Sequence, residues 1–180
     1  ALPIFRRALM SKQPRYKGVL ELAADKAGWG KPLPAGVHRG IAQFMGYGSY
    51  TAAVAEVSMK GNDVTVHRIV LATNCGHALN PDQIAAQIEG SVAYGMTTLH
   101  SEISVENGRV VETNFHNFRV MKIAEMPKVE TVLVPTGDFW GGVGEPPMAA
   151  VGPALGNAIF AATGKRIRST PFRMHDLSWS

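Results

Sequence analysis

Apolar residues follow a helical spacing near the start of the chain. Between Pro14 and Ala27 they lie at positions that share one face of a helix, namely Val19, Leu20, Leu22, Ala23 and Ala27. Pro14 suits a first helical turn and Gly28 suits the residue after the last one. The segment 29–34 is too rich in Pro and Gly for regular structure. The pattern therefore predicts a helix over residues 14–27, followed by an irregular connection.

From Gly40 the pattern changes to that of strands. Residues 41–47 and 51–59 are apolar and partly β-branched, and the run Gly46-Tyr47-Gly48-Ser49 interrupts them. Residues 60–63 form a turn, and residues 64–71 alternate as expected for the returning strand of a hairpin.

The clearest helix begins after Asn80, which is a favourable N-cap and is followed by Pro81 at the first helical position. Its core face is marked by apolar residues four positions apart, Ile84, Ile88 and Val92. Gln87 lies at the edge of this stripe. Its amide either points into a cleft or is simply solvated, and the spacing leaves both open.

A second hairpin is predicted from the Asn-Gly signal in the turn 106–108, with strands over residues 99–105 and 109–115. Residues 128–134 read as the last strand. With the helices, these hairpins predict an α+β fold, and no linker divides residues 1–180 into separate domains.

The stretch 140–147 combines three glycines within four positions with one carboxylate, Glu145, and two prolines. Glycine lets the backbone approach a ligand closely, and Pro146 favours an extended conformation for Glu145. A buried helix is expected over residues 148–162, with Pro153 in its first turn and Gly164 as its stop. A rigidly held acid beside a flexible loop suits a general base. The alternative is a solvated Glu in a surface turn.

Composition narrows the classes of function. The 180 residues suffice for one domain or a large piece of a bigger one, and only 18% are charged. The net charge is +4, with a basic group near the C-terminus at Lys165, Arg166, Arg168 and Arg173. A nucleic-acid surface would need a longer basic stripe, so no nucleic-acid partner is expected. The chain begins at Ala1 without a Met and looks like a piece of a longer protein.

Protein-ligated metals are not expected either. Cys75 is the single cysteine, which excludes an iron–sulfur cluster held by four Cys of this chain. The six histidines show no zinc spacing. Cys75 is either a nucleophile or, more commonly for this setting, a small buried residue. Without a nucleophile or metal set, chemistry would have to come from a bound cofactor, with protein groups moving protons.

Several motifs agree with one known family. They are Gly142-Val143-Gly144-Glu145-Pro146-Pro147, Asn74-Cys75-Gly76 with Asn80-Pro81, and Gln87-Ile88-Glu89-Gly90, joined by the segments 29–34, 46–57 and 157–168. Together they resemble the C-terminal part of the large subunit in the xanthine oxidase family of molybdenum hydroxylases, closest to the isoquinoline 1-oxidoreductase beta subunit. Asn74 stands where that family usually has Asp.

The resemblance implies a molybdopterin cofactor carrying molybdenum, in bacteria usually as the cytosine dinucleotide. By position, Glu145 would be the base on the Mo–OH group, and Gln87 would hydrogen-bond the pterin. Gly142, Val143 and Gly144 would bring backbone N–H groups close to the oxygen ligands of the metal. The run 115–119 falls where the family often lines the substrate entrance.

The implied reaction is hydroxylation of an isoquinoline-like N-heteroaromatic at an electron-poor carbon, with oxygen from water. Aldehyde oxidation and a non-catalytic assembly module that has lost the cofactor are the alternatives. The implied partners are the rest of the large subunit, a small subunit with [2Fe-2S] clusters and a cytochrome c acceptor. The family branch favours the bacterial periplasm or the periplasmic membrane face, and the cytoplasm stays open.

Overall fold

The computed structural model describes residues 2–178, with side chains from residue 5 onward. The helices are α1 (Leu2–Leu9), α2 (Pro14–Lys26), α3 (Pro81–Gly95) and α4 (Glu145–Thr163). The strands are β1 (Val37–Gly46), β2 (Ser49–Lys60), β3 (Asp63–Asn74), β4 (Val105–Glu106), β5 (Arg109–Val110) and β6 (Lys128–Leu133). Short 3₁₀ turns cover Met96–Leu99, Ile123–Glu125 and Phe172–Met174. This mixture confirms the α+β class.

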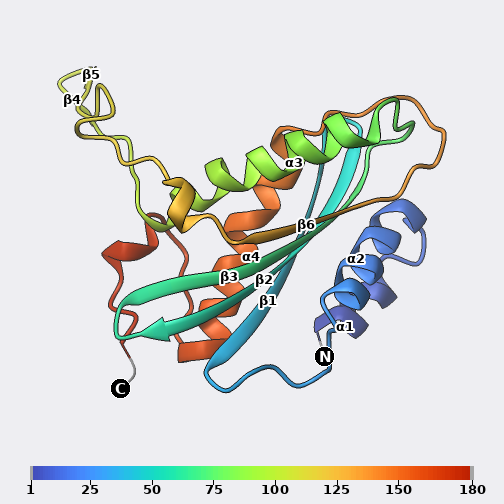
Figure 1. Ribbon diagram of the computed structural model, residues 1–180, viewed down its shortest axis with the longest axis horizontal. Helices are drawn as coiled ribbons and strands as arrows, with labels where there is room; N and C mark the ends of the chain where they lie inside the picture. Colours follow the sequence, from blue (N-terminus) through green and yellow to red (C-terminus); the bar gives the residue numbers. More distant parts are fainter. Residues whose placement is uncertain (1, 179–180) are drawn as a thin grey trace.

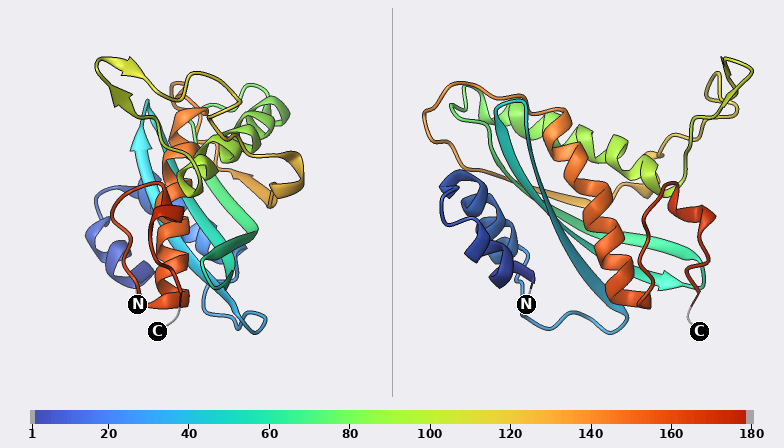
Figure 2. Two further views of the ribbon diagram at one scale, coloured as in Figure 1. Left: turned by 90° about the vertical axis from the view of Figure 1, so that its left-hand side faces the viewer. Right: turned by 180° about the vertical axis from the view of Figure 1, so that it is seen from behind.

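The central sheet has the order β1-β2-β3-β6. Strands β1 to β3 form an antiparallel meander, and β6 pairs with β3 in parallel. The sheet lies between two layers of helices: α1 and α2 lie on one side, whereas α3 and α4 lie on the other (Figure 1; Figure 2). Because parallel pairing needs a long crossover, the chain passes through α3 before it returns as β6.

Both faces of the sheet carry apolar residues, so each helix layer has its own core. On the α3–α4 side, the core includes Ala55, Val57, Leu71, Ile88, Val92, Val151, Leu155 and Ile159. On the α2 side, it includes Val19, Leu20, Ile41, Val54 and Val70. Successive strand residues point to opposite faces, so Val54 and Ala55 belong to different cores.

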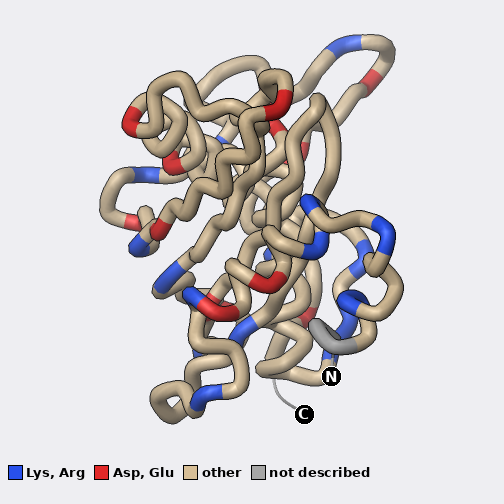
Figure 3. The backbone as a smooth tube through the Cα atoms, turned by 90° about the vertical axis from the view of Figure 1, so that its right-hand side faces the viewer, with Lys and Arg blue, Asp and Glu red and all other residues tan. Residues whose placement is uncertain are grey.

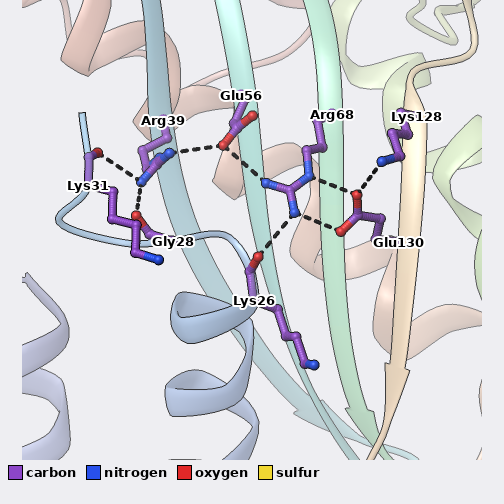
Figure 4. A network of polar contacts seen from close by, with 8 residues as sticks. All are labelled: Lys26, Gly28, Lys31, Arg39, Glu56, Arg68, Lys128 and Glu130. Carbon is purple, nitrogen blue, oxygen red and sulfur yellow. Dashed lines mark hydrogen bonds and ion pairs between the residues drawn. The ribbon is translucent and has the colours of Figure 1, made fainter. Parts of the chain in front are cut away.

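A network of charged residues crosses the four strands near the C-terminal end of α2 (Figure 4). Glu56 on β2 contacts Arg39 on β1 at 3.1 Å and Arg68 on β3 at 3.5 Å. Arg68 also pairs with Glu130 on β6 at 2.6 Å and donates to the carbonyl of Lys26 at 3.0 Å. The network therefore joins all four strands of the sheet to α2.

The predicted helix ends are confirmed where capping chemistry marks them. The side chain of Asn80 accepts a hydrogen bond from the Gln83 N–H at 3.2 Å, as an N-cap does. Gly28 and Gly164 follow α2 and α4 with positive φ values of 65° and 73°. The hairpins β1–β2–β3 and the last strand β6 were also expected.

The second hairpin is much smaller than predicted, because only Val105–Glu106 pairs with Arg109–Val110. The Asn-Gly turn is correct, but the predicted strand residues outside these two pairs are not in strands, and Leu99 ends a 3₁₀ turn. This hairpin projects away from the sheet and helices (Figure 1). An isolated two-stranded ribbon lacks a packing surface and is marginal in water, which explains its short strands.

The last helix begins earlier than predicted, at Glu145 rather than Met148. Pro146 and Pro147 fall in its first turn, where N–H groups have no helical acceptor and their absence costs nothing. Glu145 is therefore the first helical residue, and the expectation of an extended backbone there is wrong. Pro153 lies inside the helix rather than in its first turn.

Positive charge is also distributed away from the C-terminal group. Figure 3 shows Lys and Arg positions along the α1–α2 segment, which carries Arg6, Arg7, Arg15 and Lys17.

Within residues 2–178, no helix combines the length and the apolar character that crossing a membrane requires.

Candidate functional site

Three segments that are far apart in the sequence meet at one end of the sheet. They are the β1–β2 turn at Tyr47-Gly48, residues 74–77 at the end of β3, and the loop 136–144 that leads into α4. Hydrogen bonds join the second and third: the His77 N–H donates to the Asp138 carbonyl at 2.9 Å, and the Thr136 N–H donates to the Gly76 carbonyl at 3.1 Å. The glycine loop is therefore anchored before it reaches α4.

The glycine loop packs directly on the β1–β2 turn. The Gly141 N–H donates to the Cys75 carbonyl and the Gly142 N–H donates to the Tyr47 carbonyl, both at 2.9 Å. A Cβ atom added at Gly141 would lie 2.1 Å from Ser49 Oγ. Only glycine fits this approach, so the small residues serve packing as well as backbone freedom.

Glu145 occupies the N-terminal position of α4 and is exposed. The prolines that follow it are buried, as are Ala150 and Val151, so the helix itself is held firmly. A carboxylate at the N-terminus of a helix interacts favourably with the unpaired N–H groups there. The structure thus presents the predicted acid to solvent on a fixed helix.

Gln87 on α3 reaches the glycine loop from the other side. A Cβ atom at Gly144 would lie 3.2 Å from Gln87 Nε2, so the amide rests against that glycine. Gln87 is exposed, and its amide makes no hydrogen bond among the described residues. Gln87 and Val143 also line a cavity of about 410 Å³ together with Cys75, His77, Leu79, Asn80, Gln83, Ile84, Trp140 and Gly141.

Tyr47 is a further residue of the site, which sequence analysis treated only as part of an interruption between strands. The side chain of Glu145, as a hydrogen-bond acceptor and then as a negative charge, raises the pKa of Tyr47 above its usual value. The two residues are 98 positions apart, so only a Tyr-Gly turn between strands hinted at this effect.

Cys75 and Asn74 are buried behind the loop, where their surroundings indicate a structural role. The Cys75 thiol is 3% exposed, and burial raises its pKa, which suits the reading as a small buried residue rather than a nucleophile. Asn74 is also buried, and its side-chain oxygen accepts hydrogen bonds from Arg15 and from the Gly76 N–H. The replacement of Asp by Asn thus affects a local hydrogen-bond cluster behind the loop.

The run 115–119 does not lie near Glu145, contrary to the expectation that it lines the substrate entrance. Figure 1 shows this segment beside β4–β5, at the opposite end of the molecule from the loop 136–144. The reason is α3, whose 15 residues carry the chain about 22 Å along its axis before the hairpin begins.

Comparison with known proteins identifies the family. The model of the molybdopterin cofactor-binding domain matches residues 13–127. The chain belongs to this family. The expected resemblance to the molybdopterin-binding subunits of the xanthine oxidase family is thereby confirmed, although the matched region ends before Glu145.

Two relatives are equally similar to this chain. It is 31% identical to the isoquinoline 1-oxidoreductase subunit beta of Brevundimonas diminuta, over 94% of this chain and 22% of the relative. It is also 31% identical to the membrane-bound aldehyde dehydrogenase [pyrroloquinoline-quinone] of Gluconacetobacter polyoxogenes, over 96% of this chain and 25% of the relative. The chain thus spans about a quarter of each relative's length.

The fold is also shared with solved molybdenum enzymes. The aldehyde oxidoreductase of Desulfovibrio desulfuricans superimposes with a TM-score of 0.60 at 27% identity, over 69% of this chain and 14% of that one. This match confirms that the α+β arrangement described above is the fold of a molybdopterin-binding domain.

The residues at the site fit part of such a cofactor. None of the hydrogen bonds within the described residues uses the N–H groups of Val143 and Gly144, so these two donors could serve an oxygen-rich group. The free amide of Gln87 both donates and accepts, which suits the edge of a pterin. Among the described residues, no three His, Cys, Asp or Glu side chains gather to hold a metal ion.

Proposed function

We propose that this chain is the part of a molybdenum hydroxylase large subunit that supplies the general base and one side of the molybdopterin site. The observation that carries the proposal is the position of Glu145. It is an exposed carboxylate at the start of a well-packed helix, beside two free N–H groups and a free amide.

In this proposal, each group has one task. The Glu145 carboxylate accepts a proton during the reaction, since an exposed acid on a fixed helix is available without rearrangement. The amide of Gln87 binds the pterin edge. The N–H groups of Val143 and Gly144 donate to oxygen atoms of the cofactor, and Gly142 keeps the loop backbone close to them.

When bound, the molybdenum cofactor supplies the oxygen transfer and takes up the electrons of the oxidised substrate. We propose the cytosine dinucleotide form, with electrons leaving through [2Fe-2S] clusters on a separate small subunit and then to a cytochrome c. Cys75, buried and single in this chain, takes no part in that route.

We propose an N-heteroaromatic substrate, hydroxylated with water-derived oxygen at an electron-poor carbon beside a ring nitrogen. Aldehyde oxidation is the second candidate, because the identity to the isoquinoline enzyme and to the aldehyde dehydrogenase is the same, 31%. Nothing in the glycine loop discriminates between the two, since both reactions need the same base.

The test is metal and substrate analysis of the complete large subunit, purified with its small subunit. The proposal predicts one molybdenum per subunit, oxidation of isoquinoline, and incorporation of ¹⁸O from labelled water into the product. Turnover of aldehydes alone would favour the second candidate. A complete and well-folded complex without molybdenum or turnover would contradict both and indicate an assembly module.

A further inference from the structure

A second cavity lies away from the glycine loop, beside β1 at the edge of the sheet. It measures about 630 Å³ and is lined by α4 and by the segment 166–172, which runs back along that helix, together with Arg6 of α1 and Thr98 (Figure 2). Asn157 of α4 lines it too, and donates a hydrogen bond from Nδ2 to the Ile41 carbonyl of the edge strand at 2.9 Å. The helix layers from both sides of the sheet therefore reach this cavity.

The charges around the cavity all have one sign. Three arginines line it, Arg6, Arg166 and Arg168, and no Asp or Glu is among the lining residues. Among the residues that the structure describes, no ion pair involves any of these three side chains. Like charges that converge without a counterion repel one another, so an anion placed between them would be attracted by all three.

Arg166 is held in place without any ligand. Its Nη1 donates to Asn157 Oδ1 at 3.0 Å, and its Cζ lies 3.5 Å from the ring centre of Phe160. A guanidinium carries five N–H donors in a fixed plane, so most of them stay available beside the one that Asn157 uses. Because the direction of this side chain is already restricted, it loses little conformational entropy when it binds an anion.

The rest of the wall is apolar or carries hydroxyl groups. Pro153, Ile167 and Phe172 form the apolar part, and Ser169 and Thr170 supply the hydroxyls. The volume of about 630 Å³ lies within the range of sites for small organic molecules and is larger than a lone inorganic phosphate needs. Arginine binds phosphate oxygens through two parallel N–H groups. The combination suits a molecule that joins phosphate groups to an apolar ring.

This cavity is separate from the candidate cofactor site. Neither Glu145 nor Gln87 lines it, and the loop glycines do not line it either. Gly152, the first residue of α4 in its wall, follows Glu145 by seven positions, which is about 10 Å along the helix axis. The two sites therefore use different parts of α4.

We propose that the cavity between Arg6, Arg166 and Arg168 binds a small molecule with a diphosphate or triphosphate group and an aromatic ring, of the class of the nucleoside phosphates. The three guanidinium groups bind the phosphate oxygens, and the ring lies against Ile167 and Phe172. This site does not depend on the role of Glu145, so it stands or fails independently of the proposed function.

Calorimetry on the full-length large subunit, purified with its small subunit and cofactor, tests the site with ADP, pyrophosphate and adenosine as probes. We expect ADP to bind more tightly than pyrophosphate and adenosine not to bind, because the phosphates contact the arginines. The affinity for ADP should fall as the salt concentration rises, since mobile ions screen these contacts. An absence of ADP binding, or adenosine bound as tightly as ADP, would overturn the proposal.

Substitutions locate the binding. Arg168→Ala is expected to raise the Kd for ADP at least about tenfold, the scale of a lost hydrogen bond between charged groups. Arg168 is exposed, so the fold should be preserved. Arg109→Ala, at an exposed arginine of β5 outside the cavity, removes the same charge and should leave the Kd unchanged. Equal effects of the two substitutions would show a response to net charge alone and overturn the site.

Molybdenum content separates this cavity from the cofactor site. We expect Arg168→Ala to retain as much molybdenum as the wild type, because the residues assigned to the cofactor do not line the cavity. A loss of molybdenum together with the loss of ADP binding would show that the arginines hold part of the cofactor, and would overturn a separate site.

Discussion

Arg15 donates two hydrogen bonds to the side-chain oxygen of Asn74, from Nη2 at 2.7 Å and from Nε at 3.1 Å. The same oxygen accepts the Gly76 N–H at 3.1 Å. The guanidinium also lies 4.6 Å from the ring centre of Tyr50 and 3.5 Å from Asp138 Oδ2. Through Arg15, helix α2 thus holds the end of β3 and the loop that carries the site.

Arg15→Ala is expected to lower the free energy of unfolding by about 1–3 kcal/mol, because the buried oxygen of Asn74 loses two of its three donors. Urea unfolding measures the change. Lys17→Ala on the same helix is the control, since it removes only an exposed contact with Glu21 at 3.9 Å and should cost less than about 0.5 kcal/mol. Equal effects of both substitutions would refute the role of Arg15.

Gly141→Ala is expected to displace the glycine loop. The new Cβ atom would lie 2.1 Å from Ser49 Oγ and 2.7 Å from the Gly48 carbonyl carbon, so the backbone has to move. We expect a loss of about 1–3 kcal/mol in stability, together with reduced molybdenum retention. Gly18→Ala, where nothing lies within 4 Å of the new atom, should instead stabilise α2 by about 0.5–1 kcal/mol. A neutral Gly141→Ala would show that the loop does not depend on this approach.

The ion pairs of Glu130 should make the free energy of unfolding decrease in acid. Its hydrogen bonds with Arg68 and then Lys128 lower its pKa from 4.5 to about 2. Because the folded protein has the lower pKa, this stabilisation is fully present above the unfolded pKa of 4.5 and disappears as the pH falls toward 2. Urea unfolding at several pH values should show a steeper decline for the wild type than for Glu130→Gln. Parallel curves for the two proteins would contradict the assignment.

The sequence allowed prediction of those elements whose ends carry local chemistry. Asn80 caps α3 and Gly28 follows α2 as expected, because both depend on residues a few positions away. The start of α4 was misplaced because consecutive prolines suggest an interruption, although a first turn tolerates them. Strands β4 and β5 are short because they have no packing surface. No local sequence pattern shows whether such a surface is present.

The site was predictable only in part, for the same reason. Glu145, Gln87 and the loop glycines belong to motifs that are continuous in the sequence. Their positions relative to one another depend on the contacts of the loop 136–144 with the turn at Tyr47 and with the residues at the end of β3. Arg15 binds Asn74 across 59 positions, and the Tyr47 carbonyl accepts the N–H of the distant Gly142, so both contacts appear only in the folded chain.

Gln87→Ala is expected to reduce the molybdenum content of the purified complex, because it removes the free amide beside Gly144. The protein should stay folded, since Gln87 is an exposed position on α3. Glu89→Ala, another exposed position on the same helix, provides the control and should retain the metal. Unchanged molybdenum in Gln87→Ala would favour a solvated side chain without a role in binding.

If Glu145 is the general base, Glu145→Gln should abolish most of the turnover. This substitution keeps the size of the side chain and the start of α4, but removes the proton acceptor. In the assembled, molybdenum-loaded complex, we expect unchanged metal content and a kcat lowered by at least about a hundredfold, the usual scale for loss of a general base. Turnover equal to that of the wild type at equal molybdenum content would contradict this role of Glu145.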